Sequence, residues 1–158
     1  METQALRTAL GRFVTGVTIV TCLDGRGQPV GLTVNSFQAL SLEPPLVLWS
    51  LRKKSSTLEA FTHARHFAVN VLAEEQLELS HRFASRVEHK FTDGAWLPGL
   101  HGVPVLAGCA AVFECESTSQ HPGGDHIIII GRVRSTSTSA KAPLLYHAGQ
   151  YRALGDVL

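Results

Sequence analysis

Charged residues are scarce in this sequence, and neither sign of charge predominates. Asp, Glu, Lys and Arg make up 17% of the 158 residues, and 14 basic residues against 13 acidic ones leave a net charge of +1. A nucleic-acid-binding protein needs clustered Lys and Arg, so we expect no nucleic-acid partner. The longest apolar runs have the length of a strand, far below the ~20 residues of a membrane span. Because the N-terminus also has an early Glu and lacks the apolar segment of a signal peptide, we expect no membrane association and a cytoplasmic location.

Disulfide, metal-binding and nucleotide-binding motifs are also missing. The three cysteines, Cys22, Cys109 and Cys115, are odd in number and lack C-x-x-C spacing, which predicts reduced, mostly buried thiols. The eight histidines form no H-E-x-x-H pattern and no zinc spacing with cysteine, so we expect no metal site. The absence of G-x-S-x-G, G-x-G-x-x-G and Walker glycine patterns argues against a serine hydrolase, a Rossmann fold and a nucleoside-triphosphate site.

Strand patterns dominate what is present. They cover residues 17–23, 29–40, 46–51, 66–72, 109–118 and 126–136, with a further short strand expected near Tyr151. Helical spacing is confined to residues 5–13, 52–65 and 73–84, whereas residues 85–104 are typical of a loop and 135–143 of a polar connection. Since the strands follow one another directly, we expect one domain over residues 1–158, mainly β with peripheral helices, in a closed or partly closed antiparallel barrel.

Polar residues at the ends of predicted strands have either a structural or a binding explanation. Thr33, Asn35 and Ser36 would hydrogen-bond to the next turn or face a planar polar ligand. In "RKKSST" (52–57), residues 54–57 would cap the following helix or cradle a phosphate. In "HRFASRVEHKF" (81–91), basic residues alternate with two phenylalanines, as in a surface loop or in a loop that closes over an anionic aromatic ligand.

The segment "GGDHIIIIGRV" (123–133) places two titratable residues, Asp125 and His126, before the most apolar run of the chain. The run Ile127–Ile130 predicts a strand buried on both faces. Two glycines, Gly123 and Gly124, precede these residues.

Taken in order, these segments resemble the short-chain flavin reductase family, the FMN-binding split-barrel reductases that supply two-component monooxygenases. Each segment alone is weak, but the ordered set spans nearly the whole chain and is specific. Within this family, the sequence resembles the flavin reductases of phenol and 4-hydroxyphenylacetate hydroxylase systems. The matching segments are "RTALGRFVTGVTIVT" (7–21), "GLTVNSFQALSLEPPLVLWSL" (31–51), "KSST" (54–57), "FAVNVL" (67–72), "HRFA" (81–84), "HKF" (89–91), "GGDHIIIIGRV" (123–133) and "PLLYHAGQY" (143–151).

The resemblance implies an antiparallel Greek-key split β-barrel, a homodimer, and a flavin, FAD or FMN, bound near the dimer interface. It implies NADH, with NADPH as the alternative, as the hydride donor, and a flavin-dependent oxygenase as the partner that receives reduced flavin. His126 would be the catalytic residue beside the nicotinamide, and Asp125 would orient His126 or cap the loop. A flavin-binding electron-transfer protein and a small β-barrel that only binds a partner are the alternative functions. The flavin-binding residues that the resemblance implies are Thr33, Val34, Asn35, Ser36, Ser50, Leu51, Lys54, Ser55, Ser56, Ala84, Arg86, Lys90, Phe91, His126, His147 and Tyr151.

Overall fold

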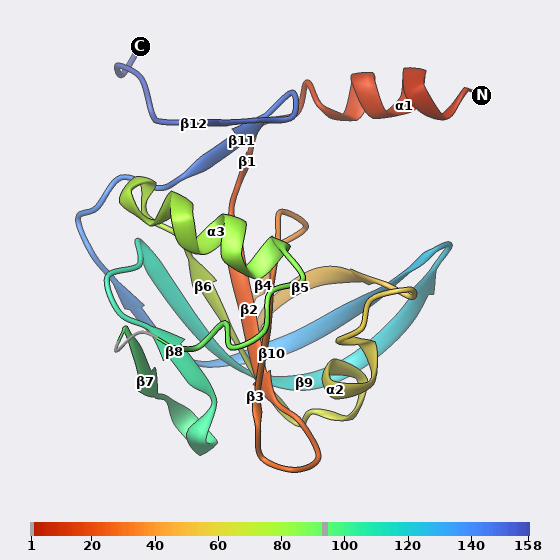
Figure 1. Ribbon diagram of the computed structural model, residues 1–158, viewed down its shortest axis with the longest axis vertical. Coiled ribbons are helices and arrows are strands. Elements are labelled where there is room, and N and C mark those ends of the chain that lie inside the picture. The colour runs from red at the N-terminus through yellow and green to blue at the C-terminus, as the bar shows by residue number, and fades with distance from the viewer. Residues whose placement is uncertain (1, 93–94) are drawn as a thin grey trace.

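Seven antiparallel strands form the main sheet of the protein, for which a computed structural model describes residues 2–92 and 95–158 (Figure 1). The strand order is β3-β2-β6-β9-β10-β5-β4. Because no backbone pairing joins the end strands β3 and β4 within the described residues, the sheet is not a closed barrel. The predicted mainly β, antiparallel architecture with peripheral helices is confirmed. The bounds of the strands are Thr18–Leu23 (β2), Pro29–Val34 (β3), Gln38–Leu42 (β4), Pro45–Arg52 (β5), His66–Val71 (β6), Ala111–Gly123 (β9) and His126–Thr138 (β10).

Helices and short strands lie around this sheet. In Figure 1, the helix α3 covers one side of the sheet, while α1 and a three-stranded sheet form a lobe at one end, where both termini lie. No helix in the described ranges has the length and apolar character that crossing a membrane requires. The helices are α1 (Thr3–Leu10), α2 (Leu58–His63), α3 (Leu77–Ala84) and the 3₁₀ turns η1 (Glu74–Gln76) and η2 (Leu100–Gly102). The short strands are β1 (Thr15–Gly16), β11 (Leu145–His147) and β12 (Gln150–Arg152) in the lobe, and β7 (Trp96–Pro98) with β8 (Pro104–Leu106).

Several element boundaries differ from the sequence-based predictions. The predicted strand 29–40 is two strands, because the chain leaves the sheet after Val34 and re-enters it at Gln38. Residues 85–104 are not only a loop, since they contain β7 and the first residue of β8. The segment 135–143 is not only a connection, since β10 continues to Thr138, which pairs with Ala111. The strand near Tyr151 is confirmed as β12.

The prediction that Ile127–Ile130 are buried on both faces is wrong. Ile129 is 1% exposed and pairs with Trp49 of β5 in the core, whereas its neighbours in the run are only half-buried. A strand is fully covered when layers pack on both of its faces. In this sheet the side chains of β10 alternate between the core and a face that the chain covers incompletely.

A glycine in β3 lets α3 pack closely on the sheet. A Cβ atom at Gly31 would lie 3.0 Å from the ring of Phe83 and 3.1 Å from that of Phe91. Phe83 is the last buried residue of α3, and the hydroxyl of Thr33 donates a hydrogen bond to the carbonyl of Ser80 at 2.7 Å. These contacts fix the C-terminal end of α3, and the loop that follows it, beside the end of β3.

The cysteines are all free and buried, in agreement with the prediction. Burial raises the pKa of each thiol to about 12. They are therefore unreactive packing residues rather than nucleophiles.

Candidate functional site

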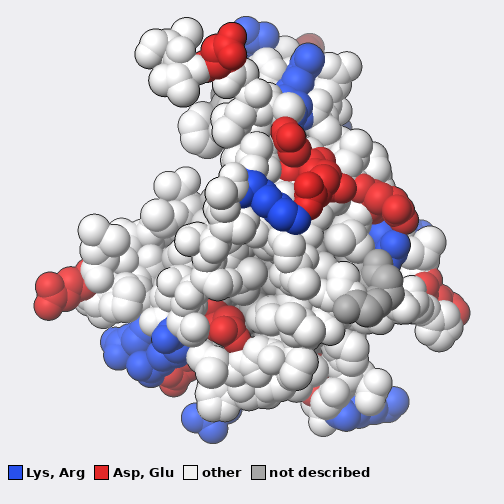
Figure 2. Space-filling model, turned by 90° about the vertical axis from the view of Figure 1, so that its left-hand side faces the viewer, with Lys and Arg blue, Asp and Glu red and all other residues white. Residues whose placement is uncertain are grey.

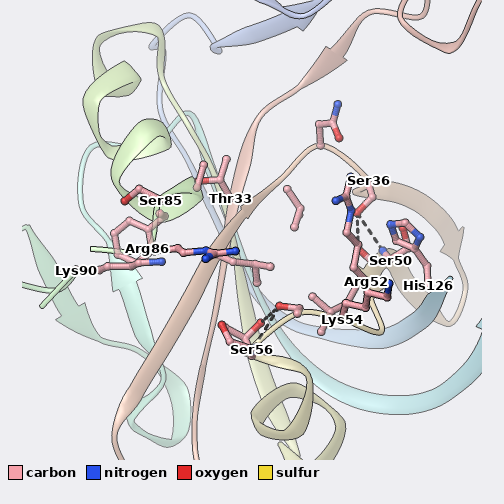
Figure 3. A pocket seen from close by; sticks show the side chains of 18 of the residues that line it. Thr33, Ser36, Ser50, Arg52, Lys54, Ser56, Ser85, Arg86, Lys90 and His126 are labelled. Carbon is pink, nitrogen blue, oxygen red and sulfur yellow. Dashed lines mark hydrogen bonds between the residues drawn. The ribbon is translucent and has the colours of Figure 1, made fainter. Parts of the chain in front are cut away.

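A cavity of about 1010 Å³ opens between the ends of β3 and β5 and the loop after α3. Its volume is at the upper end of the ~300–1,000 Å³ range of small-molecule sites, so it accommodates a ligand of nucleotide size. Figure 3 shows Ser36, Ser50, Arg52 and His126 on one wall, Thr33, Ser85, Arg86 and Lys90 across from them, and Ser56 below. The full lining comprises Leu32, Thr33, Val34, Asn35, Ser36, Ser50, Leu51, Arg52, Lys54, Ser55, Ser56, Thr57, Phe83, Ala84, Ser85, Arg86, Val87, Lys90 and His126.

The hydroxyls at the end of β3 are hydrogen-bonded to the backbone. Ser36 Oγ donates to the carbonyl of Ser50 at 2.8 Å and accepts from its amide at 3.0 Å, and Thr33 Oγ1 is bound to α3. Ser36 thereby joins the loop after β3 to β5. Both hydroxyls therefore have a structural role while they also line the cavity. The side-chain amide of Asn35 forms no hydrogen bond in the described parts of the chain, so it is available to a ligand.

The turn between β5 and α2 folds around Ser55. Its Oγ lies 2.8 Å from Thr57 Oγ1 and accepts from the Thr57 amide at 3.2 Å, and its own amide donates to the carbonyl of Arg52 at 3.0 Å. Thr57 precedes α2 without a side-chain cap. The hydroxyl of Ser56 and the ammonium group of Lys54 form no hydrogen bond with any described residue, and both line the cavity. Ser55 and Thr57 thus shape the turn, whereas Lys54 and Ser56 present their polar groups to the cavity.

The opposite wall combines an aromatic ring with two cations. Phe83 belongs to the core and also lines the cavity, and Lys90 Nζ lies 5.9 Å from the centroid of its ring. Burial lowers the pKa of Lys90 from its usual value. Arg86 lies exposed at the rim. An anion on this wall would therefore meet a partly desolvated ammonium group.

His126 is held by its neighbour at the entrance of β10. Its Nδ1 lies 2.7 Å from Asp125 Oδ1, and this hydrogen bond lowers the pKa of the Asp125 carboxyl. A carboxylate only accepts, so Nδ1 carries the proton of this bond, and Nε2 forms no hydrogen bond with a residue that the structure describes. The carbonyl of Asp125 also accepts a hydrogen bond from the Lys53 amide at 2.9 Å. The carboxylate of Asp125 therefore orients His126, while its main-chain carbonyl joins the hairpin tip to the end of β5.

The cavity is strongly cationic. Its lining includes Arg52, Lys54, Arg86 and Lys90 but no Asp or Glu among the described residues. Figure 2 views the molecule from the left-hand side of Figure 1, and there acidic side chains cluster at the upper right, with basic side chains beside them. A cationic cleft raises the local concentration of anionic ligands, so the site suits phosphate-bearing substrates.

Comparison with known families matches residues 10–155 to the flavin reductase like domain. The chain belongs to this family. It is 46% identical over 150 residues to the FMN reductase (NADH) SmoA of Agrobacterium fabrum (strain C58), a match that covers 95% of this chain and 85% of that protein. It is 45% identical over 155 residues to the flavin-dependent monooxygenase reductase subunit HsaB of Rhodococcus jostii (strain RHA1), covering 98% of this chain and 79% of that protein.

Other members of the flavin reductase family differ in length. A probable flavin reductase of Rhizobium meliloti (strain 1021) is 45% identical over 150 residues, covering 95% of this chain but 48% of that protein, so the chain spans about half of that relative.

The NADH:FAD oxidoreductase SgcE6 of Streptomyces globisporus C-1027, solved with NAD and FAD fragments, superposes with a TM-score of 0.92 at 35% identity, covering 98% of this chain and 93% of that one. The predicted relationship to the flavin reductases is confirmed.

The residues of the cavity fit a flavin, the ligand that the family name suggests. Leu32, Val34, Leu51 and Phe83 offer apolar contact to a flat ring system, and the unengaged hydroxyl of Ser56 beside a lysine suits a phosphate. Aromatic and aliphatic walls with a few converging polar groups are typical of such sites.

All but three of the flavin contacts that the resemblance implies line this cavity. Phe91 instead packs against Phe83 in the core, with ring centroids 5.0 Å apart. His147 and Tyr151 lie in the lobe, where the Tyr151 hydroxyl is 2.7 Å from Ser80 Oγ. Their contact with flavin stays a prediction.

Sequence reasoning missed several lining residues. Arg52 and Ser50 are two positions apart on β5, and side chains with this spacing share one face of a strand. That periodicity was the signal for Arg52. Thr57 and Phe83 line the cavity as well, and the sequence had offered both as candidates, in the segments 54–57 and 81–91. No local signal singles out the remaining lining residues, Leu32, Ser85 and Val87.

Proposed function

We propose that this protein is an NAD(P)H:flavin oxidoreductase that transfers a hydride from NADH to FAD or FMN. The observation that carries this proposal is the cationic cavity, to which no described residue contributes a carboxylate, in a chain similar to an FMN reductase (NADH) and to an NADH:FAD oxidoreductase. Reduced flavin then serves a flavin-dependent oxygenase, which the similarity to the reductase subunit HsaB supports. The antiparallel sheet and these relatives also support the Greek-key split barrel, and the free cysteines support a cytoplasmic location.

The chain supplies binding and orientation. Flavin, when bound, provides the hydride-accepting chemistry. Lys54 and Ser56 bind its phosphate, Asn35 and the apolar residues beside it contact the ring and ribityl groups, and Arg86 with Lys90 closes the other side. His126, with its ring fixed by Asp125, packs against the nicotinamide, and the walls exclude water from the reacting atoms.

Steady-state kinetics test this function directly. NADH and NADPH are each combined with FAD, FMN and riboflavin, and oxidation of the nicotinamide is followed at its absorbance maximum. We expect turnover with NADH and either nucleotide flavin. Flavin binding without nicotinamide oxidation would support the electron-transfer protein instead, and the absence of flavin binding would leave only the partner-binding barrel.

A homodimer is part of the same proposal. The helix α1 has no buried residue, and Leu6, Leu10, Phe13 and Val14 are between 44% and 72% exposed along one short segment. An exposed apolar surface of this kind marks an interaction site, and a two-fold pair is the commonest assembly. Both the low charge of the chain and the projection of α1 from the main sheet support this (Figure 1).

Light scattering tests the dimer at micromolar concentration. We expect twice the 17.1 kDa chain mass, and dissociation in the variant Phe13→Glu. Leu97→Glu is the matched control, because Leu97 is 52% exposed on β7, away from the lobe. A monomeric wild-type protein would refute the assignment.

A further inference from the structure

Arg52, the last residue of β5, stands beside His126 on one wall of the cavity. Strand pairing places the two residues directly opposite each other on β5 and β10. Side chains at such positions of an antiparallel pair share one face, with Cβ atoms about 5 Å apart. Both residues line the cavity, and Figure 3 shows them on the same wall with Ser36 and Ser50.

The donors of Arg52 are not used within the chain. Its guanidinium is exposed and forms no side-chain hydrogen bond or ion pair with the residues that the structure describes. The acidic neighbour, Asp125, is already engaged by His126 Nδ1 at 2.7 Å. A guanidinium has five N–H donors in a planar fork, so Arg52 offers a complete anion-binding group to the cavity.

The flavin phosphate has other donors. In Figure 3 the turn with Ser56 lies below the cavity, and Arg86 with Lys90 lies on the far wall. Arg52 is the cation that strand pairing sets next to His126, the residue assigned to the nicotinamide. A second phosphate-bearing ligand, the nicotinamide dinucleotide, approaches the cavity from that side in the proposed function.

We propose that Arg52 binds the diphosphate of the nicotinamide dinucleotide and thereby positions the nicotinamide against His126. This rests on the proposed function. The planar fork of arginine matches two phosphate oxygens in a bidentate contact, which a lysine ammonium does not reproduce. Arg52 therefore makes the enzyme prefer a dinucleotide over a simple dihydronicotinamide as hydride donor, while Lys54 and Ser56 serve the flavin.

Binding and kinetics of Arg52→Gln test the proposal. Calorimetric titration with NAD⁺ is expected to show a dissociation constant about tenfold higher than in the wild type, which corresponds to about 1.4 kcal/mol. The KM for NADH rises by a similar factor, whereas turnover with 1-benzyl-1,4-dihydronicotinamide, which has no phosphate, is unchanged. Arg52→Lys lies between the wild type and Arg52→Gln. The dissociation constant for FMN stays at its wild-type value in both.

Lys53→Gln is the matched control. Lys53 has the same charge, is exposed and is adjacent in the chain, but it does not line the cavity, and its contact with Asp125 uses the backbone amide. We expect it to bind NAD⁺ as the wild type does.

Three results would overturn the assignment. An unchanged NAD⁺ affinity in Arg52→Gln would exclude a contact with the dinucleotide. Weaker FMN binding with riboflavin unaffected would assign Arg52 to the flavin phosphate. An equal loss with both hydride donors would assign it to the flavin ring. Failure of the proposed function itself is distinct, because the wild-type protein would then oxidise neither hydride donor.

Discussion

Ser56→Ala isolates the hydroxyl that we assign to the flavin phosphate. Ser55 and Thr57 bind each other at 2.8 Å and support the turn, whereas Ser56 Oγ has no partner in the described chain and is exposed at the cavity. A hydrogen bond to a charged group contributes about 1.5–3 kcal/mol. Because Ser56 is solvent-accessible, we take the lower end, which corresponds to about a tenfold rise in the dissociation constant for FMN.

Fluorescence titration measures this effect, with riboflavin as the ligand control and Ser55→Ala as the protein control. Riboflavin lacks the phosphate, so its affinity is expected to be the same in Ser56→Ala and the wild type. Ser55→Ala removes the hydrogen bonds that shape the turn, so it is expected to lower the melting temperature, which Ser56→Ala does not change. Equal weakening of FMN and riboflavin in Ser56→Ala, or a change of less than about twofold for FMN, would refute the phosphate cradle.

Three further predictions concern the other parts of the cavity and the core. His126→Ala is expected to leave the melting temperature and the FMN affinity unchanged. It should slow flavin reduction in anaerobic stopped-flow experiments or raise the KM for NADH, by about tenfold for each 1.4 kcal/mol of lost positioning. If the melting temperature and the FMN affinity fall together, the residue is structural. Burial lowers the pKa of Lys90, so the FMN affinity should fall as the pH rises through that lowered pKa, because the protonated form binds the phosphate. In FMN titrations over the alkaline range, Lys90→Arg, which stays charged, should remove this pH dependence. If the pH dependence persists in Lys90→Arg, Lys90 is not its cause. Gly131→Ala places a Cβ atom 2.4 Å from the ring of the buried Phe67. Urea denaturation is expected to show a free energy of unfolding lower by about 1–3 kcal/mol, whereas the control Gly25→Ala, where a Cβ atom would have no neighbour within 4 Å, should have little effect. Equal stabilities of the two variants would show that the core absorbs the added methyl group.

The sequence by itself determined the secondary structure class and most of the chemistry of the site. The strand patterns at residues 17–23 and from residue 29 onward predicted two strands, which the structure confirms as the paired strands β2 and β3, because side-chain alternation is a local property. The ordered segments predicted the family, which the comparisons confirm. The resemblance implied that the polar residues of 33–36 and 54–56 contact one ligand, and these residues line one cavity.

Tertiary structure decided which of those groups are available to a ligand. Ser55 and Ser56 are equivalent in the sequence, yet only Ser56 is left without a partner once the turn folds around Ser55. Phe83 and Phe91 were equivalent aromatic residues of the segment 81–91, yet only Phe83, near the end of α3, lines the cavity, whereas Phe91 packs against Phe83 in the core. The strand period puts Arg52 on the same face as Ser50, but only the pairing of β5 with β10 places it opposite His126, a residue 74 positions later in the chain. Hydrogen-bond partners and cavity walls come from segments that are distant in sequence, so local patterns of residue type do not predict them.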